Sequence, residues 1–138
     1  MYSFSQRSRN NLLFIHPDLV KVMNEAIKNS PIDFIITDGI RSTEEQRKLY
    51  NQGRTTSGKI VTNADGVNNK SNHQVKSDGY GYAVDLYPFY NGSAQLNDAK
   101  SLKVIADHIK SVAKELGVTI QWGGDWKFKD YPHFELVK

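Results

Sequence analysis

Two histidines and two carboxylates in the second half of the chain are of the types that could hold a metal ion beside a general base. His73 lies in a polar stretch, Asp85 in an apolar run, and His133 opens the last apolar segment, with Asp130 three residues before it. The chain has no cysteine, so a metal must be held by imidazole nitrogen and carboxylate oxygen. Two histidines, one carboxylate and a water molecule form a common catalytic zinc shell, and a nearby carboxylate such as Asp130 could accept the proton of that water. The pattern therefore indicates hydrolytic chemistry.

These residues also have ordinary interpretations. A loop histidine such as His73 is commonly a solvated polar residue, and His133 could be a hydrogen-bonded strand histidine. Asp85 is more informative, because a buried carboxylate is costly unless it is paired or bound to a metal. His16 at a helix start and His108 beside the buried stripe of a helix are assigned structural roles.

The apolar spacing predicts the elements that must position these side chains. It predicts helices over residues 17–29, 43–51 and 98–116, and strands over residues 32–37, 82–87, 118–122 and 133–137. The Ser42–Glu45 pair has the pattern of a capping box, Asn97 or Asp98 caps the last helix, and Gly117 follows its last turn. Residues 1–15 are expected to be a short lead-in that docks on the core.

Alternation within residues 82–87 places Ala83, Asp85 and Tyr87 on one face of a strand that Pro88 is expected to end. Gly123-Gly124 is expected to form a tight turn. Residues 54–70 are rich in Gly, Asn, Thr and Ser, and a loop of this length commonly forms a wall or lid of a site. We therefore expect one α+β domain over residues 1–138. Its small, mostly antiparallel sheet would carry Asp85 and His133, with helices packed on one side.

The composition fits this view and excludes other classes. The 138 residues are 38% hydrophobic and 24% charged, which suits one ordinary domain with a packed core. The net charge of +3 is mild, and no basic run with interleaved aromatic residues indicates nucleic-acid binding. No apolar segment has the length of a membrane span, and residues 1–15 lack the pattern of a signal peptide. We expect a monomer that is made in the cytoplasm and does not insert into a membrane.

Several motifs, in one order, resemble those of the zinc peptidases of the VanY and L-alanyl-D-glutamate peptidase kind, which many bacteriophages use as endolysins. The S-x-H…G-x-A-x-D motif of that family is similar to Ser71-Asn72-His73 and Gly81-Tyr82-Ala83-Val84-Asp85. Its second motif, an acidic residue followed three positions later by histidine, is similar to Asp130-Tyr131-Pro132-His133. The resemblance begins at about residue 34 and includes the stretches GIRS, EEQ and WGGDW.

The resemblance implies a role for each candidate residue. It implies His73, Asp85 and His133 as ligands of one Zn²⁺ ion, and Asp130 as the catalytic base. Arg41 would position the substrate or stabilise the oxyanion, and Ser71 would orient the ligand loop or contact the substrate. The implied fold is Hedgehog/D,D-peptidase-like.

The implied function is hydrolysis of the peptide stem of bacterial peptidoglycan, and the phage members favour L-alanyl-D-glutamate endopeptidase action. Three alternatives stay open: a D,D-carboxypeptidase that releases terminal D-alanine, a non-catalytic, metal-containing wall-binding module, and a structural or DNA-associated phage protein, which only the basic isoelectric point suggests. The resemblance further implies that the protein reaches the wall only after release from the host cytoplasm. No separate wall-binding domain is expected.

One segment departs from the family pattern. Residues 74–80 separate His73 from Gly81, where the family usually has two residues. This insertion is expected to loop out without moving His73, or to reshape the substrate cleft. It also contains Asp78, a rival metal ligand.

Overall fold

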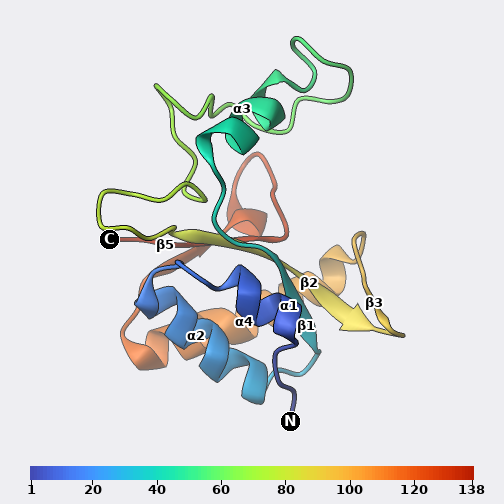
Figure 1. The fold of residues 1–138 in the computed structure, drawn as a ribbon. Helices are drawn as coiled ribbons and strands as arrows, with labels where there is room; N and C mark the ends of the chain where they lie inside the picture. Colours follow the sequence, from blue (N-terminus) through green and yellow to red (C-terminus); the bar gives the residue numbers. More distant parts are fainter.

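An antiparallel sheet of five strands crosses the computed structural model, which describes all of residues 1–138 (Figure 1). The strand order is β1-β2-β5-β4, and the short β3 pairs with the far end of β2. The strands are β1 Phe34–Asp38, β2 Ala83–Tyr90, β3 Ser93–Ala94, β4 Ile120–Trp122 and β5 His133–Leu136. The fold is therefore α+β with a small antiparallel sheet, as predicted.

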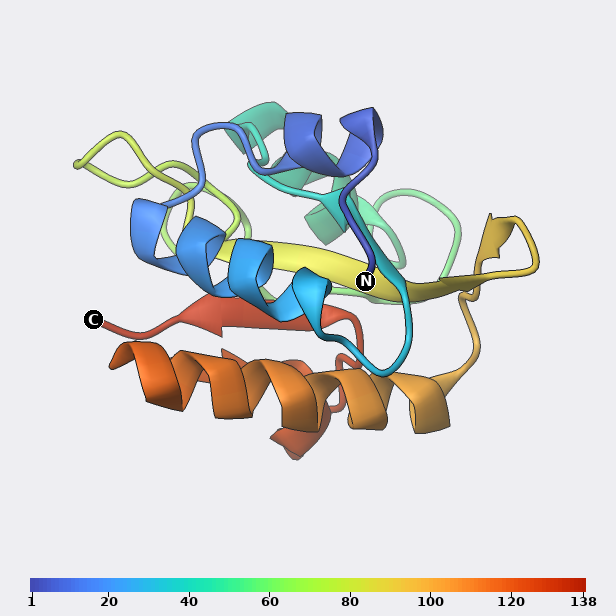
Figure 2. The ribbon, with the colours of Figure 1, turned by 90° about the horizontal axis from the view of Figure 1, so that it is seen from below.

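Three of the four helices pack on one face of this sheet, where the hydrophobic core lies, as predicted, and the fourth stands apart on the other side. The helices are α1 Gln6–Asn11, α2 Pro17–Lys28, α3 Thr43–Asn51 and α4 Ala99–Leu116, with a 3-10 turn η1 at Gly123–Asp125. α1, α2 and α4 cover one face, and α3 lies on the other (Figure 1). α2 and α4 pack against each other and lie side by side in front of the sheet in Figure 2. Leu19 of α2, Ile105 of α4 and Phe134 of β5 are fully buried in this core.

The predicted alternation along β2 is confirmed. Val84 and Leu86 belong to the core, so Asp85 and Tyr87 face the opposite side of the sheet. In the register of β2 with β5, Asp85 lies directly opposite His133. Strand pairing alone therefore brings two of the candidate ligands together.

The predicted helix ends are also confirmed. Ser42 and Glu45 form both hydrogen bonds of a capping box, and Asp98 caps α4 by accepting from the backbone N–H of Ser101. Gly117 adopts the left-handed conformation after α4. Residues 52–82 contain no helix or strand, and this segment includes the long loop expected at residues 54–70.

The prediction for residues 1–15 missed helix α1. Its sequence, QRSRNN, has no apolar periodicity from which a helix could be predicted. Tertiary contacts define it instead. Ser5 caps the helix, and the buried hydroxyl of Ser8 accepts the backbone N–H of Ile36 at 3.0 Å. α1 therefore docks on the edge strand β1.

The prediction that Pro88 ends its strand was wrong, because β2 continues to Tyr90. Proline interrupts a strand when its missing N–H is needed for pairing. Here the N–H of Phe89 donates to the carbonyl oxygen of Asp33, next to β1. Because successive residues of a strand alternate, the nitrogen of Pro88 points away from β1. On that side β5 pairs only with residues 83–85, and no partner requires a donor at Pro88.

The tight turn expected at Gly123-Gly124 is instead the 3-10 turn η1. The carbonyl oxygen of Gly123 accepts from the N–H groups of Trp126 (3.3 Å) and Asp130 (3.0 Å), which closes the loop that leads to β5.

No helix of the structure is both long and apolar enough to cross a membrane.

Gly123 provides a test of this packing. A Cβ atom at this position would overlap the carbonyl oxygen of Asp130, without any cost from a left-handed φ. We expect Gly123→Ala to lower the free energy of unfolding by about 2–3 kcal/mol, the usual cost of overpacking. Chemical denaturation measures this change. The matched control is Gly92→Ala, where no atom lies within 4 Å of the added Cβ and only the backbone strain of a positive φ arises. Equal losses in the two variants would contradict the argument.

Candidate metal centre

Three side chains converge on one point beside the sheet. Asp85 comes from β2, His133 from β5, and His73 from the loop before β2. Asp85 Oδ1 lies 3.3 Å from His73 Nε2 and 3.5 Å from His133 Nδ1, and the two nitrogens are 3.2 Å apart. One atom from each residue can therefore contact the same metal ion.

The remaining nitrogen of each histidine is held by a protein acceptor. His73 Nδ1 is 2.9 Å from the carbonyl oxygen of Gly39, which can only accept, so this nitrogen carries the proton. His133 Nε2 is 2.7 Å from Glu135 Oε1. These contacts fix ring orientation and leave His73 Nε2 and His133 Nδ1 directed at Asp85, an arrangement typical of metal-bound histidines.

Asp85 has a buried oxygen that the protein does not satisfy. Its Oδ1 has no hydrogen-bond partner, although one nitrogen of each imidazole lies within 3.5 Å of it. Burial works against ionisation, but His133 and His73 hold the pKa of the Asp85 carboxyl well below its ordinary value. A buried, ionised and unpartnered oxygen that faces two imidazoles fits a site completed by a cation.

The charges around His133 favour a cation at the same place. Burial disfavours the imidazolium, but Asp85 and Glu135 overcome this and raise the pKa of His133 to about 9. The interaction also affects Glu135: burial opposes its ionisation, but His133 keeps the pKa of Glu135 below its ordinary value. In the metal-free protein a proton on His133 therefore supplies positive charge between two carboxylates.

Asp130 lies at the rim of this cluster. Its Oδ2 is 3.8 Å from His133 Nδ1, and about half of the side chain is exposed. Burial and the negative charge of Asp85 raise its pKa, which suits a group that must take up a proton. Two hydrogen bonds fix the turn: the Trp122 indole N–H donates to the Tyr131 carbonyl at 2.7 Å, and the backbone N–H of His133 donates to the Asp130 carbonyl at 3.1 Å.

A network of polar groups holds the His73 loop. The Ser71 hydroxyl accepts the N–H of His73 at 3.2 Å, so Ser71 orients the loop as one of its two predicted roles requires. The buried amide of Gln74 accepts from the Ser71 N–H and donates to the Gly66 carbonyl. The backbone N–H of Arg41 donates to the His73 carbonyl at 2.8 Å.

Arg41 is held by a buried glutamine that the sequence analysis did not single out. Its Nη1 donates to Gln46 Oε1 at 2.8 Å. Gln46 is fully buried, and its amide also donates to the Ala64 carbonyl at 2.8 Å. The glutamine thus ties the guanidinium to the loop of residues 54–70.

These groups open on one cleft of about 870 Å³. The three candidate ligands, Asp130, Arg41 and Ser71 all line it. Trp126 forms part of the wall, with its ring centre 5.0 Å from that of His133. Asp38 and Tyr87 also line it, and burial is the main cause that raises the pKa of each.

Asp78 is not part of the cluster, so its suggested role as a rival ligand is not supported. Its carboxylate accepts from the hydroxyl of Tyr82 and from the N–H of Tyr80, away from the three convergent atoms. His16 caps α2, and His108 Nε2 bonds to the Ala26 carbonyl at 2.8 Å, so both have the structural roles expected of them.

The sequence analysis missed Glu135 and the carbonyl of Gly39, which orient the two histidines. Glu135 could have been found, because a residue two positions after His133 in a strand lies on the same face. Gly39 gave no such signal, since any residue has a carbonyl oxygen. Its lack of a side chain matters as well: a Cβ there would overlap the Asn11 carbonyl.

Sequence comparisons place the chain among known peptidases. The family model of the phage L-alanyl-D-glutamate peptidase matches residues 1–137. The peptidoglycan L-alanyl-D-glutamate endopeptidase CwlK of Bacillus subtilis (strain 168) is 38% identical over 138 residues, which covers 89% of this chain and 74% of that protein. The L-alanyl-D-glutamate peptidase of Escherichia phage T5 is 28% identical over 137 residues, which covers 99% of this chain and 90% of that protein.

Solved structures agree with this relationship. The L-Ala D-Glu endopeptidase ChiX of Serratia marcescens matches 97% of this chain and 89% of its own, with a TM-score of 0.75 and 32% identity. The vancomycin-resistance D,D-dipeptidase VanXYg matches 89% of this chain and 50% of its own, with a TM-score of 0.58 and 20% identity, and so supports the fold alone. The family resemblance drawn from the motifs is confirmed. This chain belongs to the phage L-alanyl-D-glutamate peptidase family.

Proposed function

We propose that the protein is a zinc peptidase that hydrolyses the bond between L-alanine and D-glutamate in the peptide stem of bacterial peptidoglycan. The observation that carries the proposal is the convergence of His73, Asp85 and His133 around an unpartnered buried oxygen at the edge of the cleft. Family membership supplies the reaction class, since the relatives CwlK and the phage T5 enzyme are both named for this bond.

The spacing of the three atoms supports zinc. Ligands at the usual 2.0–2.1 Å in a tetrahedral zinc shell lie about 3.3 Å from one another. The observed separations are 3.2, 3.3 and 3.5 Å, which correspond to one face of such a tetrahedron. We assign His73, Asp85 and His133 as the ligands of one ion. A bound zinc ion lowers the pKa of water and polarises a carbonyl group.

Asp130 is the proposed general base. Its carboxylate lies beside His133 at the cleft, and its raised pKa favours proton uptake from an attacking water. The same group can then protonate the amine of the departing D-glutamyl half. Its backbone bonds to Gly123 and His133 keep it at the rim rather than in contact with the three ligand atoms.

Arg41 is the proposed group that positions the substrate and stabilises negative charge on the scissile carbonyl oxygen. One guanidinium nitrogen is fixed by Gln46, and the side chain lines the cleft. A guanidinium held in this way offers its other N–H groups in a fixed geometry. Ser71 lines the same cleft and is a second substrate contact.

Two related activities are weaker candidates. A D,D-carboxypeptidase would use the same ligands, but the D,D-dipeptidase VanXYg supports the fold alone. A non-catalytic wall-binding module would have no use for the base at Asp130.

The similarity to the phage T5 peptidase also suggests where the protein acts. We further propose that it acts on the wall after release from the host cytoplasm, and that it does so as a monomer.

The decisive experiment analyses purified peptidoglycan by mass spectrometry after incubation with the protein. We expect new L-alanine carboxyl ends and D-glutamate amino ends, lost with a chelator and restored by zinc. Released D-alanine would instead identify a carboxypeptidase. No cleavage of walls of several chemotypes by the zinc-loaded protein would overturn the proposed function.

Asp130→Asn separates catalysis from metal binding. The substitution keeps the size of the side chain and removes its basicity, so we expect kcat to fall about a hundred- to ten-thousandfold with unchanged zinc content. Turnover of a stem peptide and metal analysis measure the two quantities. Asp107→Asn on the exposed surface of α4 is the matched control and should retain full activity. Full activity of Asp130→Asn would assign the base elsewhere, and loss of zinc would make Asp130 a ligand.

Zinc binding should release a proton. His133 has a pKa of about 9 in the metal-free protein, so at pH 7.5 it is mostly protonated, and its Nδ1 must lose the proton to bind zinc. We expect release of about one proton per zinc at pH 7.5, and an affinity that rises with pH until about pH 9. Because the pKa of His133 is raised above its ordinary value of 6.5, its contribution to the stability of the metal-free fold is complete below pH 6.5 and disappears as pH rises through 9.

Calorimetry in buffers of different ionisation enthalpy counts the released protons. The control titration is His133→Ala, which lacks the titrating group and one ligand, and should show both weak binding and little proton release. Tight zinc binding by the unaltered protein without proton release at pH 7.5 would contradict the assignment of His133.

A further inference from the structure

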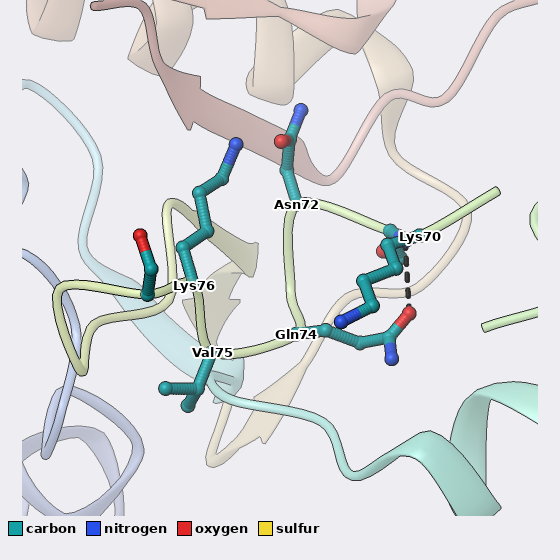
Figure 3. Close-up of a pocket in the computed structure, with 7 residues that line it drawn as sticks. Lys70, Asn72, Gln74, Val75 and Lys76 are labelled. Atoms are coloured by element: carbon teal, nitrogen blue, oxygen red, sulfur yellow. Dashed lines mark hydrogen bonds between the residues drawn. The ribbon is translucent and has the colours of Figure 1, made fainter. Parts of the chain in front are cut away.

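A second, cationic cavity adjoins the proposed catalytic cleft. It has a volume of about 530 Å³ and is lined by residues of the 70–77 stretch, among them Lys70 and Lys76 but no carboxylate (Figure 3). Lys70, Ser71 and Asn72 line both this cavity and the cleft, so the two spaces lie side by side. A substrate that lies across the metal site can therefore extend one side into the cavity.

Neither lysine ammonium group has an anionic partner in the protein. No ion pair or side-chain hydrogen bond engages Lys70 or Lys76. The Nζ atom of Lys76 lies 4.6 Å from the ring centre of Tyr82, a cation–π contact that leaves the ammonium free to bind an anion.

The segment that carries these lysines is fixed before any ligand binds. The side chain of Gln74 is buried between them and bonds to Ser71, Gly66 and Thr43 (Figure 3 shows the bond with Ser71). The insertion is closed by two backbone bonds of 2.9 Å, from the Lys76 N–H to the Tyr80 carbonyl and from the Gly79 N–H to the Lys76 carbonyl. This order reduces the entropy lost when the lysines bind a ligand.

The charged side chains differ between the cleft and the adjoining cavity. Besides Asp85, the cleft around the three proposed ligands carries four carboxylates and three cations, whereas the charged groups of the adjoining cavity are lysines only. The carboxylates are Asp38, Glu45, Asp130 and Glu135, and the cations are Arg41, Lys48 and Lys70. An anionic group of the substrate is repelled by the carboxylate side and attracted to the lysine side. The peptide can therefore bind in one orientation more favourably than in the other.

The proposed substrate has an anionic group at the required place. A D-glutamyl residue has two carboxyl groups, and only one of them can continue the peptide chain. The other is a free negative charge next to the scissile bond. Resting on the proposed function, we infer that Lys70 and Lys76 bind this free carboxylate and select stems in which it is not amidated. The insertion of residues 74–80 contributes Lys76, and so serves substrate specificity.

The test compares two stem peptides that are identical except that the free carboxyl of the D-glutamyl residue is a carboxylate or a carboxamide. We expect the zinc-loaded protein to have about a tenfold higher kcat/KM for the carboxylate peptide. Lys70→Met and Lys76→Met should each reduce this ratio about two- to fivefold, mainly through KM, and the double variant should abolish it. The ratio should also fall with rising salt. Lys114→Met, which removes one exposed charge on the far side of the sheet, is the control and should leave the ratio unchanged.

The outcomes separate the two proposals. Equal cleavage of both peptides, by wild type and variants alike, overturns the inference and leaves the endopeptidase function intact. If neither peptide is cleaved, the proposed function fails, and calorimetric binding of both peptides to Asp130→Asn decides the inference. Tighter binding of the carboxylate peptide that depends on Lys70 and Lys76 supports it, whereas equal affinity overturns it.

Discussion

The antiparallel register of β2 with β5 is the constraint on which the rest of the site depends. It places Asp85 opposite His133 on the face of the sheet away from the core. A shift of β5 by one residue would turn His133 toward α2 and α4 and expose Phe134, and a shift of β2 would do the same to Asp85 and Val84. The hydrophobic core and the metal cluster thus specify the same register, and the energy of burial on one face fixes the geometry on the other.

His73 is placed by different means, since no strand carries it. Backbone and side-chain hydrogen bonds from Arg41, Ser71 and Gly39 hold its loop against the end of β1. Two residues of the cluster therefore lie on strands, and the third is held by a polar loop network. Such a network positions a ligand accurately only when each buried group is satisfied, and the buried amide of Gln74 meets this condition.

The sequence predicted the parts of the structure that follow from periodicity and local capping. The face of Asp85, the ends of α3 and α4, and the three convergent residues could all be derived from spacing and motif. Helix α1 could not, because its polar sequence is helical only through the docking of Ser8 on β1. β2 continues through Pro88 because its pairing with β5 ends before that residue, and this pairing cannot be derived from the local sequence. The role of Gln46 depends on its hydrogen bonds to Arg41 and Ala64, and that of Glu135 on the strand face that it shares with His133. Residue type alone therefore did not reveal either role.

The close approach of Gly39 to Asn11 links the N-terminal segment to the metal cluster. The Gly39 carbonyl orients His73, while its Cα lies against the backbone that ends α1, and the Asn11 amide bonds to Ile36 within β1. Fraying of α1 would thus loosen the support of one ligand without touching the strands that hold the other two. Local opening at the N-terminus and exchange of the metal therefore belong to one cooperative unit, and slow amide hydrogen exchange in α1 would accompany slow loss of the ion.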